Sequence, residues 1–375
     1  MRYCVDPDIA AASTLEGTFY RDGEALAAAR ERVFARTWQW IGALDDVATP
    51  GSLAPRDLMP GLLDEPLLLA RDGGGTLRCL SNVCTHRGNI LVKSACRAEQ
   101  IRCGYHSRRF DLAGRMVFMP EFLGVKDFPS AADNLAEVPF GEWAGHGFAA
   151  IDPAAPLEAF LGDMKARLSW LPMDRFRAEP ASSRDFDIEA HWALYVENYL
   201  EGFHIPFVHA GLNQVVDYGS YSSELFRYSN LQVALAKHGE SAFDPPAASP
   251  DQGRPVAAYY WWIFPNLMLN FYPWGLSVNL VQPRGIDRTR VAFRAFVWDA
   301  SKLAAGAGSG LDRVEAEDEA IVQAVQRGVR SRYYGRGRYS PTRERGVHHF
   351  HRLLCEFLGD RPLVPNGGTS GLSPV

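Results

Sequence analysis

Two short segments of the sequence contain side chains that could bind a metal. Cys84 and His86 lie in the first segment and Cys103 and His106 in the second, with sixteen residues between His86 and Cys103. Cys-x-His followed by Cys-x-x-His predicts a [2Fe-2S] cluster in which two sulfurs hold one iron and two imidazoles hold the other. A structural zinc site is the alternative, because two cysteines and two histidines also suit a tetrahedral ion.

A second group of metal-binding side chains occurs in residues 191–209. A helix is predicted within residues 186–204, and Pro206 should end it because proline disfavours a helical conformation at Ile205. His209 can then fold back beside His204, and two imidazoles suit a non-haem Fe(II) ion if a carboxylate completes the facial triad. An ordinary solvated helix face is the alternative. Five residues at helical spacing predict the apolar side of this helix: Trp192, Tyr195, Val196, Tyr199 and Phe203.

The missing carboxylate is predicted on a long helix over residues 312–330. Asp318 falls on the apolar stripe of that helix, where an unpaired carboxylate would be costly to bury and therefore needs a partner such as a metal. Glu317 is the second choice. Glu315, Glu317 and Glu319 are predicted to lie further off the stripe, toward solvent. The stripe itself is predicted from five residues: Val314, Ile321, Val322, Val325 and Val329.

Length and composition limit the class of protein. The chain has 375 residues, enough for two domains and a large core. Its 44 acidic and 39 basic residues give a net charge of -5, too mild to suggest a nucleic-acid partner. Six cysteines without a dense framework favour a reducing compartment over a disulfide-rich secreted protein. No signal peptide or membrane span is recognisable, so a cytoplasmic location is predicted.

The order of elements predicts an α+β protein. Residues 1–37 form an N-terminal segment with a helix over 24–36, expected to pack on the catalytic domain. Short apolar runs predict a small all-β domain over 38–152, and a larger domain with antiparallel strands follows over 153–358. Further helices are predicted over 157–168 and 347–358, a flexible proline-rich loop over 241–255, and a disordered tail over 359–375.

Several motifs together resemble the α subunit of Rieske non-haem iron oxygenases, the ring-hydroxylating oxygenase family. They are residues 84–88 and 103–106, residues 198–204 with His209, residues 317–318, residues 325–328, residues 264–268 and residues 348–351. The resemblance covers nearly the whole chain and is strongest to the choline monooxygenase, glycine betaine and carnitine oxygenase branch. It implies a Rieske β-sandwich domain joined to a helix-grip catalytic domain, assembled as a homotrimer.

The resemblance also implies roles for individual residues. Cys84, His86, Cys103 and His106 would hold the [2Fe-2S] cluster, and His204, His209 and Asp318 would hold Fe(II). Asn198 and Glu201 would belong to the catalytic machinery, with Glu201 bridging His204 to His106 of the neighbouring subunit. Electrons are expected from NAD(P)H through a reductase, with a ferredoxin as an optional intermediate.

The sequence departs from the family at two places, neither of them a ligand. Family members commonly have Trp where Arg108 stands, and Asn-Trp-Lys where His191, Trp192 and Ala193 stand. The first change affects the expected docking surface for the electron donor and the tuning of the cluster.

The substrate is less clearly indicated than the chemistry. Aromatic faces attract quaternary ammonium groups, which favours hydroxylation or N-demethylation of such a compound, but aromatic residues are also common in strands and cores. The residues concerned are Tyr259, Tyr260, Trp261, Trp262, Phe264, Phe271, Tyr272 and Trp274. An oxygenase acting on an aromatic acid or ring, a Rieske electron carrier without a second iron, and a zinc-stabilised ligand-binding protein remain alternatives. His348, His349 and His351 are interpreted as packing residues of the last helix.

Overall fold

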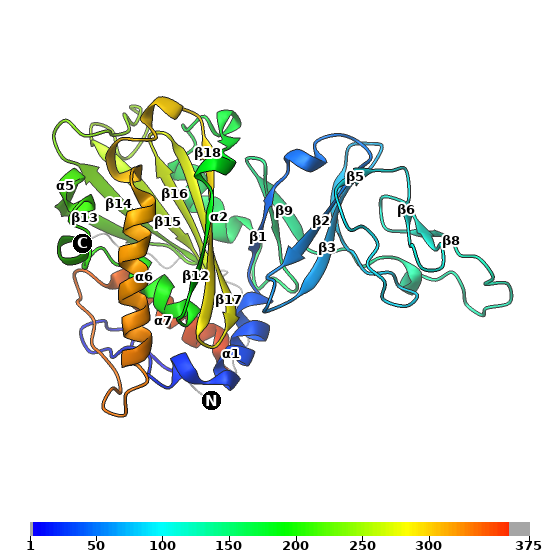
Figure 1. Cartoon of the computed structure of the whole chain (residues 1–375), viewed down its shortest axis with the longest axis horizontal. Helices are drawn as coiled ribbons and strands as arrows, with labels where there is room; N and C mark the ends of the chain where they lie inside the picture. The colour runs from blue at the N-terminus through cyan, green and yellow to red at the C-terminus, as the bar shows by residue number, and fades with distance from the viewer. Residues whose placement is uncertain (1–2, 360–375) are drawn as a thin grey trace.

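Two lobes of different construction make up residues 3–359, the part of the chain that the computed structural model describes (Figure 1). The tail predicted to be disordered, residues 359–375, lies outside the described residues except for Gly359. None of the described helices is both long and apolar enough to cross a membrane. The smaller lobe contains the Cys84 and Cys103 segments, and the larger lobe contains His204, His209 and Asp318.

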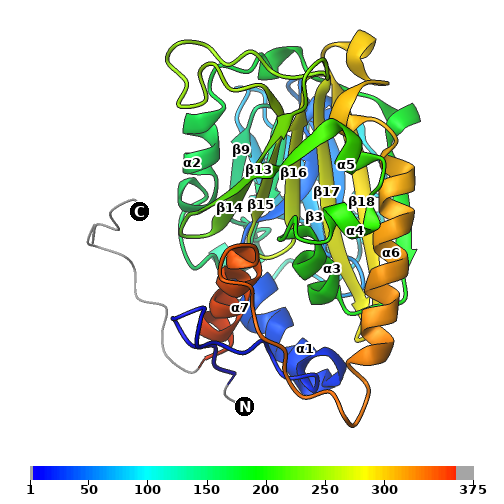
Figure 2. The ribbon, with the colours of Figure 1, turned by 90° about the vertical axis from the view of Figure 1, so that its left-hand side faces the viewer.

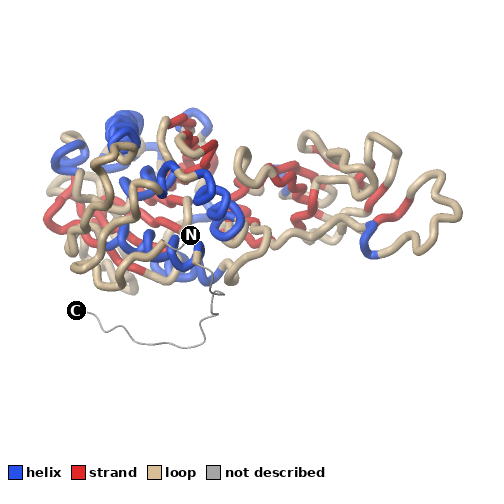
Figure 3. Tube along the Cα trace, turned by 90° about the horizontal axis from the view of Figure 1, so that it is seen from below, coloured by secondary structure: helices blue, strands red, loops and turns tan. Residues whose placement is uncertain are grey.

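The smaller lobe consists of three small antiparallel sheets joined by long loops (Figure 3). A four-stranded sheet has the order β4-β3-β2-β5, and three-stranded sheets have the orders β6-β7-β8 and β1-β10-β9. The strands are β1 (Gln39–Ala43), β2 (Ser52–Leu58), β3 (Glu65–Arg71), β4 (Leu77–Ser81), β5 (Cys96–Arg97), β6 (Ile101–Arg102), β7 (Arg109–Phe110), β8 (Met116–Phe118), β9 (Phe140–Trp143) and β10 (His146–Ala149).

The larger lobe is built on one eight-stranded antiparallel sheet, as the short connections predict. Its order is β11-β18-β17-β16-β15-β14-β13, and β12 also pairs with β18. The strands are β11 (Arg177–Ala178), β12 (Arg184–Ile188), β13 (Val216–Leu225), β14 (Ser229–Ala236), β15 (Val256–Ile263), β16 (Leu267–Tyr272), β17 (Gly275–Gly285) and β18 (Arg288–Val297).

Helices cover both faces of this sheet. The long helix α6 lies in front of the sheet in Figure 1 and α2 lies behind it, and the view in Figure 2 places them on opposite sides. The predicted N-terminal helix is present as α1, continued by a π-helical turn over Arg30–Phe34. The helices are α1 (Gly23–Ala29), α2 (Glu158–Arg167), α3 (Trp192–Tyr199), α4 (Ile205–Val208), α5 (Leu212–Val215), α6 (Leu311–Gly328) and α7 (Arg345–Leu358).

Alternation along the central strands divides the predicted aromatic residues between the two faces. Tyr260 and Tyr272 line a pocket on the side of α3 and α6. Tyr259 instead bonds to Asp251, and Trp261 stacks on Phe226. Because neighbouring side chains in a strand point to opposite faces, only part of an aromatic run can reach one site.

The two lobes meet through aromatic side chains. The His146 ring of β10 packs edge-on against Phe296 of β18, with the ring centroids 4.6 Å apart. Trp40 contacts the same phenylalanine, and Trp143 contacts Phe271 of β16. The β1-β10-β9 sheet is therefore the part of the small lobe that packs on the large sheet.

The helix predicted for residues 186–204 is shorter than expected. Arg184–Ile188 is strand β12, and Asp185 in that strand pairs with Arg290 and Arg294 of β18. The expected effect of Pro206 is also wrong, because this residue lies in the first turn of α4 and does not end a helix at Ile205. Proline is tolerated there because the first turn leaves its N–H positions unbonded in any case.

The buried stripe of α6 differs by about one residue from the prediction. Ile321 and Val325 are exposed, while Glu315, Val322 and Gln326 are buried. Glu315 and Gln326 are buried because they have hydrogen-bond partners in α3 and its N-cap residue. Tyr195 donates to Glu315, and Gln326 accepts from the His191 N–H at 2.7 Å. The expectation that Glu315 faces solvent is therefore wrong.

The histidines of α7 have separate structural partners and form no joint site. His348 Nε2 lies 2.7 Å from the Asp6 carbonyl oxygen. His351 lies between the Tyr339 hydroxyl, at 2.6 Å, and a Glu197 carboxylate oxygen, at 3.0 Å. These contacts agree with the interpretation of the run as packing residues.

Candidate active site

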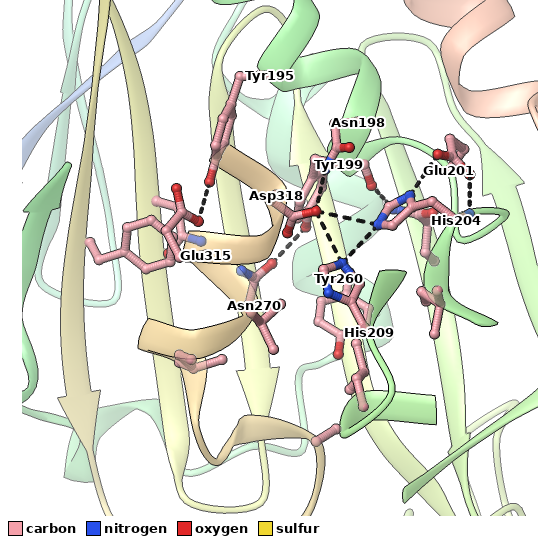
Figure 4. A pocket seen from close by; sticks show the side chains of 18 of the residues that line it. Tyr195, Asn198, Tyr199, Glu201, His204, His209, Tyr260, Asn270, Glu315 and Asp318 are labelled. Carbon is pink, nitrogen blue, oxygen red and sulfur yellow. Dashed lines mark hydrogen bonds and ion pairs between the residues drawn. The ribbon is translucent and has the colours of Figure 1, made fainter. Parts of the chain in front are cut away.

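Three side chains from two separate parts of the chain converge on one point in the large lobe (Figure 4). His204 Nε2 and His209 Nε2 are 3.0 Å apart, and Asp318 Oδ1 lies 3.0 Å from the latter and 3.5 Å from the former. All three ligand atoms lie within 4.8 Å of one another, and no other such group occurs in residues 3–359. Two imidazole nitrogens and one carboxylate around an open position are the donor set of a non-haem Fe(II) site.

Local backbone geometry explains the spacing of the two histidines. Helix α3 ends at Tyr199, and the chain turns through Gly202, where an added Cβ would approach the Tyr221 ring to 2.7 Å. The single turn of α4 then returns His209 to the level of His204, with the His209 N–H donating to the Ile205 carbonyl at 3.0 Å. A five-residue spacing therefore brings both rings to the same side.

Each of these three candidate ligands has a further polar partner. Glu201 Oε1 lies 2.6 Å from His204 Nδ1, and Glu317 Oε2 lies 2.8 Å from His209 Nδ1. A carboxylate at Nδ1 keeps the proton there and leaves the Nε2 lone pair directed at the common point. Asn198 Nδ2 donates to Asp318 Oδ1 at 2.7 Å. The two candidate acids thus differ in position, since Asp318 approaches His209 at Nε2 and Glu317 approaches it at Nδ1.

The electrostatic field at this point favours a cation. Burial opposes protonation of His209, but the hydrogen bonds and charges of Asp318 and Glu317 outweigh burial and raise the pKa of its imidazole. The same negative potential would stabilise a divalent ion, which supplies a larger positive charge than a proton.

A pocket opens beside the three side chains and contains about 760 Å³ of empty space, including the part that is open to solvent. This is within the range of small-molecule sites. Its wall includes five tyrosines: Tyr195, Tyr199, Tyr221, Tyr260 and Tyr272. Glu315 also lines it and is buried, and its Oε2 accepts from the Tyr195 hydroxyl at 2.7 Å.

Several residues of this pocket were not identified from the sequence. Glu315 lies three positions before Asp318, so the helical period alone could have placed it on the same face. Gln232, Asn270 and Asn279 come from three strands whose order in the sheet is not readable from sequence. No sequence signal marks these polar side chains as pocket residues.

In the small lobe, the two predicted cluster segments form loops with the same hydrogen bonds. The N–H of Gly88 donates to the Cys84 carbonyl, and the N–H of Ser107 donates to the Cys103 carbonyl. Each cysteine N–H in turn donates to the carbonyl five residues ahead. Gly88 and Ser107 both have a positive φ, +70° and +59°. The two segments are therefore equivalent turns that start at the cysteines.

These loops bury the sulfurs and place the imidazoles nearer the surface. Cys84 and Cys103 are buried side by side, whereas the rings of His86 and His106 are partly exposed with centroids 4.8 Å apart. Burial raises the pKa of the Cys84 thiol. For Cys103, N–H donors from Tyr105 and His106 outweigh burial and lower the pKa. Such N–H bonds stabilise thiolate ligands.

The arrangement tests the zinc alternative. A tetrahedral zinc ion needs all four donor atoms within about 4 Å of one another, given Zn–S and Zn–N bonds of about 2.3 and 2.0 Å. Within residues 3–359, Cys84, His86, Cys103 and His106 do not form such a group. A pair of buried sulfurs beside a separate pair of imidazoles instead fits a cluster with two metal atoms.

Arg108, which stands where the family commonly has Trp, is buried beside these loops. Its Nη2 atom lies 2.6 Å from Asp133 Oδ1, and its guanidinium stacks near Phe110 and Phe128. The Asp133 carbonyl also accepts from the Thr85 hydroxyl at 2.7 Å. Arg108 therefore makes internal contacts beside the cluster loops and is not exposed for the docking of an electron donor.

Comparisons with known proteins agree with both lobes. Residues 37–129 match the model of the Rieske [2Fe-2S] domain, and residues 173–360, half of the chain, match the ring hydroxylating alpha subunit (catalytic domain). The chloroplastic choline monooxygenase of Arabidopsis thaliana is 29% identical over 366 residues, covering 92% of this chain and 82% of that protein. The carnitine monooxygenase oxygenase subunit of Escherichia coli (strain K12) is 27% identical over 372 residues, covering 96% of both.

Solved structures share the fold. The quaternary ammonium Rieske monooxygenase CntA, in complex with an inhibitor, superposes with a TM-score of 0.78 at 22% identity and covers 96% of this chain and 100% of its own. Naphthalene 1,2-dioxygenase from Rhodococcus sp. gives a TM-score of 0.71 at 19% identity, covering 92% of this chain and 93% of its own. The predicted α+β architecture is thereby confirmed. The chain belongs to the Rieske-type ring-hydroxylating oxygenases as an alpha subunit, a family assignment that implies a [2Fe-2S] cluster and a mononuclear iron.

Proposed function

We propose that this alpha subunit is the terminal component of an oxygenase that hydroxylates a small ammonium compound. The observation that carries the proposal is the position of His204, His209 and Asp318, which converge at a pocket walled by five tyrosines. Tyrosine faces attract quaternary ammonium groups. The curated relatives named above act on choline and carnitine, which supports the same substrate class here.

Two sets of ligands are part of the proposal. The cluster would be held by Cys84, His86, Cys103 and His106, and the iron by His204, His209 and Asp318. When bound, the iron supplies O2 activation with electrons that arrive from the cluster. The carboxylates of Glu201 and Glu317 keep the protons on the two histidine Nδ1 atoms, and Asn198 fixes the orientation of Asp318. The pocket holds the substrate carbon near these residues and limits access of water.

The expected products depend on which carbon faces the three ligand side chains. Hydroxylation of a carbon next to nitrogen releases an aldehyde and a demethylated amine. Hydroxylation of an alcohol carbon gives an aldehyde hydrate. Electrons would come from NAD(P)H through a reductase, directly or by way of a ferredoxin.

A homotrimer in which neighbouring subunits share electrons is also part of the proposal. The cluster loops and the His204 site lie in different lobes (Figure 1), so transfer within one chain is not favoured by the arrangement. Apolar side chains are exposed at both places, with Tyr105 62% exposed beside His106 and Phe207 80% exposed beside His204. Burying them against each other would place Glu201 between His204 and the neighbour's cluster. A solved relative is described in terms of inter-subunit electron transfer.

Replacement of Asp318 by Ala tests the proposal. The variant should lose the mononuclear iron and all turnover, because two imidazoles alone leave the facial triad incomplete. It should keep the visible and EPR spectra of the reduced cluster. Iron analysis should fall from three to two atoms per chain, whereas a Glu319→Ala control should keep three. Two irons in the unaltered protein would indicate an electron carrier, and full turnover by the Asp318→Ala variant would contradict the ligand assignment.

A further inference from the structure

Apart from His204 and His209 themselves, the charged side chains that line the pocket beside them are all acidic. Glu201, Glu315 and Asp318 contribute carboxylates to its wall. Among the described residues that line it there is no arginine or lysine. Glu201 is hydrogen-bonded to His204 and Asp318 to His209 and Asn198, so these two acids already have partners. Glu315 is the acid whose place is not explained by the metal site.

One oxygen of Glu315 is left without a partner. The residue is 4% exposed, and its Oε2 accepts from the Tyr195 hydroxyl at 2.7 Å. Oε1 is buried and makes no hydrogen bond within residues 3–359. Burial raises the pKa of this carboxyl to about 8, with Asp318 and Glu319 adding to the shift and Tyr195 and His209 opposing it. A buried, unpaired carboxyl oxygen of this kind is costly. At neutral pH the raised pKa leaves this carboxyl largely protonated, and a cation bound beside it would favour the charged form.

The tyrosines around the pocket offer their rings more than their hydroxyls. The Tyr199 hydroxyl donates to Asn270 Oδ1 at 2.6 Å, and the hydroxyls of Tyr260 and Tyr272 bond to each other. With Tyr195 bonded to Glu315, four of the five lining tyrosines have paired hydroxyls, so their rings are the part that remains for a ligand. Ring faces and an unpaired carboxyl oxygen together suit a cation.

We propose that Glu315 is the counter-ion of a cationic ammonium group, and that the pocket takes a small ammonium compound without a carboxylate. This inference rests on the oxygenase function proposed above and narrows its substrate class. A substrate carboxylate would meet no arginine or lysine in this wall, and the charge of the proposed iron is already offset by the carboxylates of Asp318, Glu201 and Glu317. Arg184 does not supply such a charge, because it lines a second pocket and lies 3.7 Å from Asp312.

Binding to the unaltered holoprotein under anaerobic conditions tests the charge preference directly. The three probes are choline, its uncharged carbon analogue 3,3-dimethylbutan-1-ol, and L-carnitine, which carries both an ammonium group and a carboxylate. Isothermal titration should show choline binding at least tenfold more tightly than either of the others. Equal affinity for choline and its uncharged analogue would overturn the proposal, and so would tighter binding of L-carnitine.

A pair of variants assigns the preference to Glu315. Glu315→Gln keeps the shape and the acceptor for Tyr195 but removes the charge, so choline should bind at least tenfold more weakly while the uncharged analogue binds as before. Asp312→Asn removes an exposed acid from the same helix that does not line the pocket, and it should leave both affinities unchanged. Preserved selectivity for choline in Glu315→Gln would show that another group recognises the cation.

Product analysis separates this inference from the function on which it rests. The reduced protein is mixed with O2 and either choline or benzoate, and the products are identified. Selective binding of choline without oxidation of any ammonium compound would support the counter-ion role and contradict the proposed oxygenase substrate class. Hydroxylation of benzoate, with choline neither bound nor oxidised, would leave an oxygenase and overturn the inference.

Discussion

Asp318 and Glu317 are adjacent acids on α6, but they approach different nitrogens of the same histidine ring. Asp318 approaches Nε2 of His209, while Glu317 approaches Nδ1. Arg313 Nε lies 3.0 Å from the second oxygen of Glu317 and fixes its carboxylate. Asp318 is therefore the acid that we propose as a ligand, and we propose that Glu317 positions the ring of His209.

Glu317→Gln should weaken iron binding while leaving the cluster unchanged. The amide can still contact His209, but it lacks the charge that keeps the Nδ1 proton in place. Loss of such an outer carboxylate commonly lowers metal affinity by about 10- to 100-fold. Iron retention measured against a chelator checks this, with the cluster absorbance as internal reference and Glu319→Gln as control. An unchanged iron affinity would show that Glu317 does not position the ligand.

The candidate ligands could be proposed from the sequence, but their surroundings could not. The spacing of Cys84, His86, Cys103 and His106 is local, and so is the five-residue spacing of His204 and His209. The sequence places Glu315 toward solvent because Ile321 and Val325 are apolar and indicate another buried face of α6, yet both of these residues are exposed. The hydrogen bond from the Tyr195 hydroxyl to Glu315 joins two distant segments of the chain. The helical period of α6 does not reveal such a contact.

The proline-rich loop over residues 241–255 makes more hydrogen bonds to the rest of the large lobe than its composition predicts. It contains no helix or strand, as predicted, but Asp251 within it is fully buried. Arg167 of α2 forms two hydrogen bonds to that carboxylate, and the Tyr259 hydroxyl of β15 and Arg254 also donate to it. The loop is therefore fastened to the face of the sheet that is turned away from the active site.

Asp251→Asn should destabilise the protein by about 3 to 5 kcal/mol, because it removes one partner of a buried ion pair and leaves Arg167 less compensated. Equilibrium unfolding in urea measures the change, and limited proteolysis should show faster cleavage within the loop. Asp244→Asn, at an exposed position of the same loop, should leave stability nearly unchanged. Equal stability of the two variants would mean that the loop is held by something other than Asp251.

Three buried histidines connect the stability of the folded protein to pH. Burial lowers the pKa of His191 to about 3 and that of His349 to about 4. Burial also lowers the pKa of His146, at the contact between the lobes, to about 4, although Asp45 opposes the shift. The folded protein therefore binds fewer protons than the unfolded chain below the ordinary histidine pKa of 6.5. The stability due to these rings is complete above that pH and falls as the pH drops toward 4.

His191→Asn should make the protein less sensitive to acid. Asn keeps a side-chain acceptor for the Ala193 N–H, where His191 now caps α3, but it cannot be protonated. Between pH 6.5 and pH 5 the variant should lose about 2 kcal/mol less stability than the parent, from 1.4 kcal/mol per pH unit for one group. Urea unfolding at both pH values checks the difference. Parallel losses in the two proteins would contradict a neutral, buried His191.

The equivalent turns at Cys84 and Cys103 limit how the proposed cluster can be held. Both turns use the same backbone frame, but the imidazole stands two residues after the first cysteine and three after the second. Inserting or deleting one residue in either turn would break this frame and move one proposed sulfur ligand and one proposed imidazole ligand together.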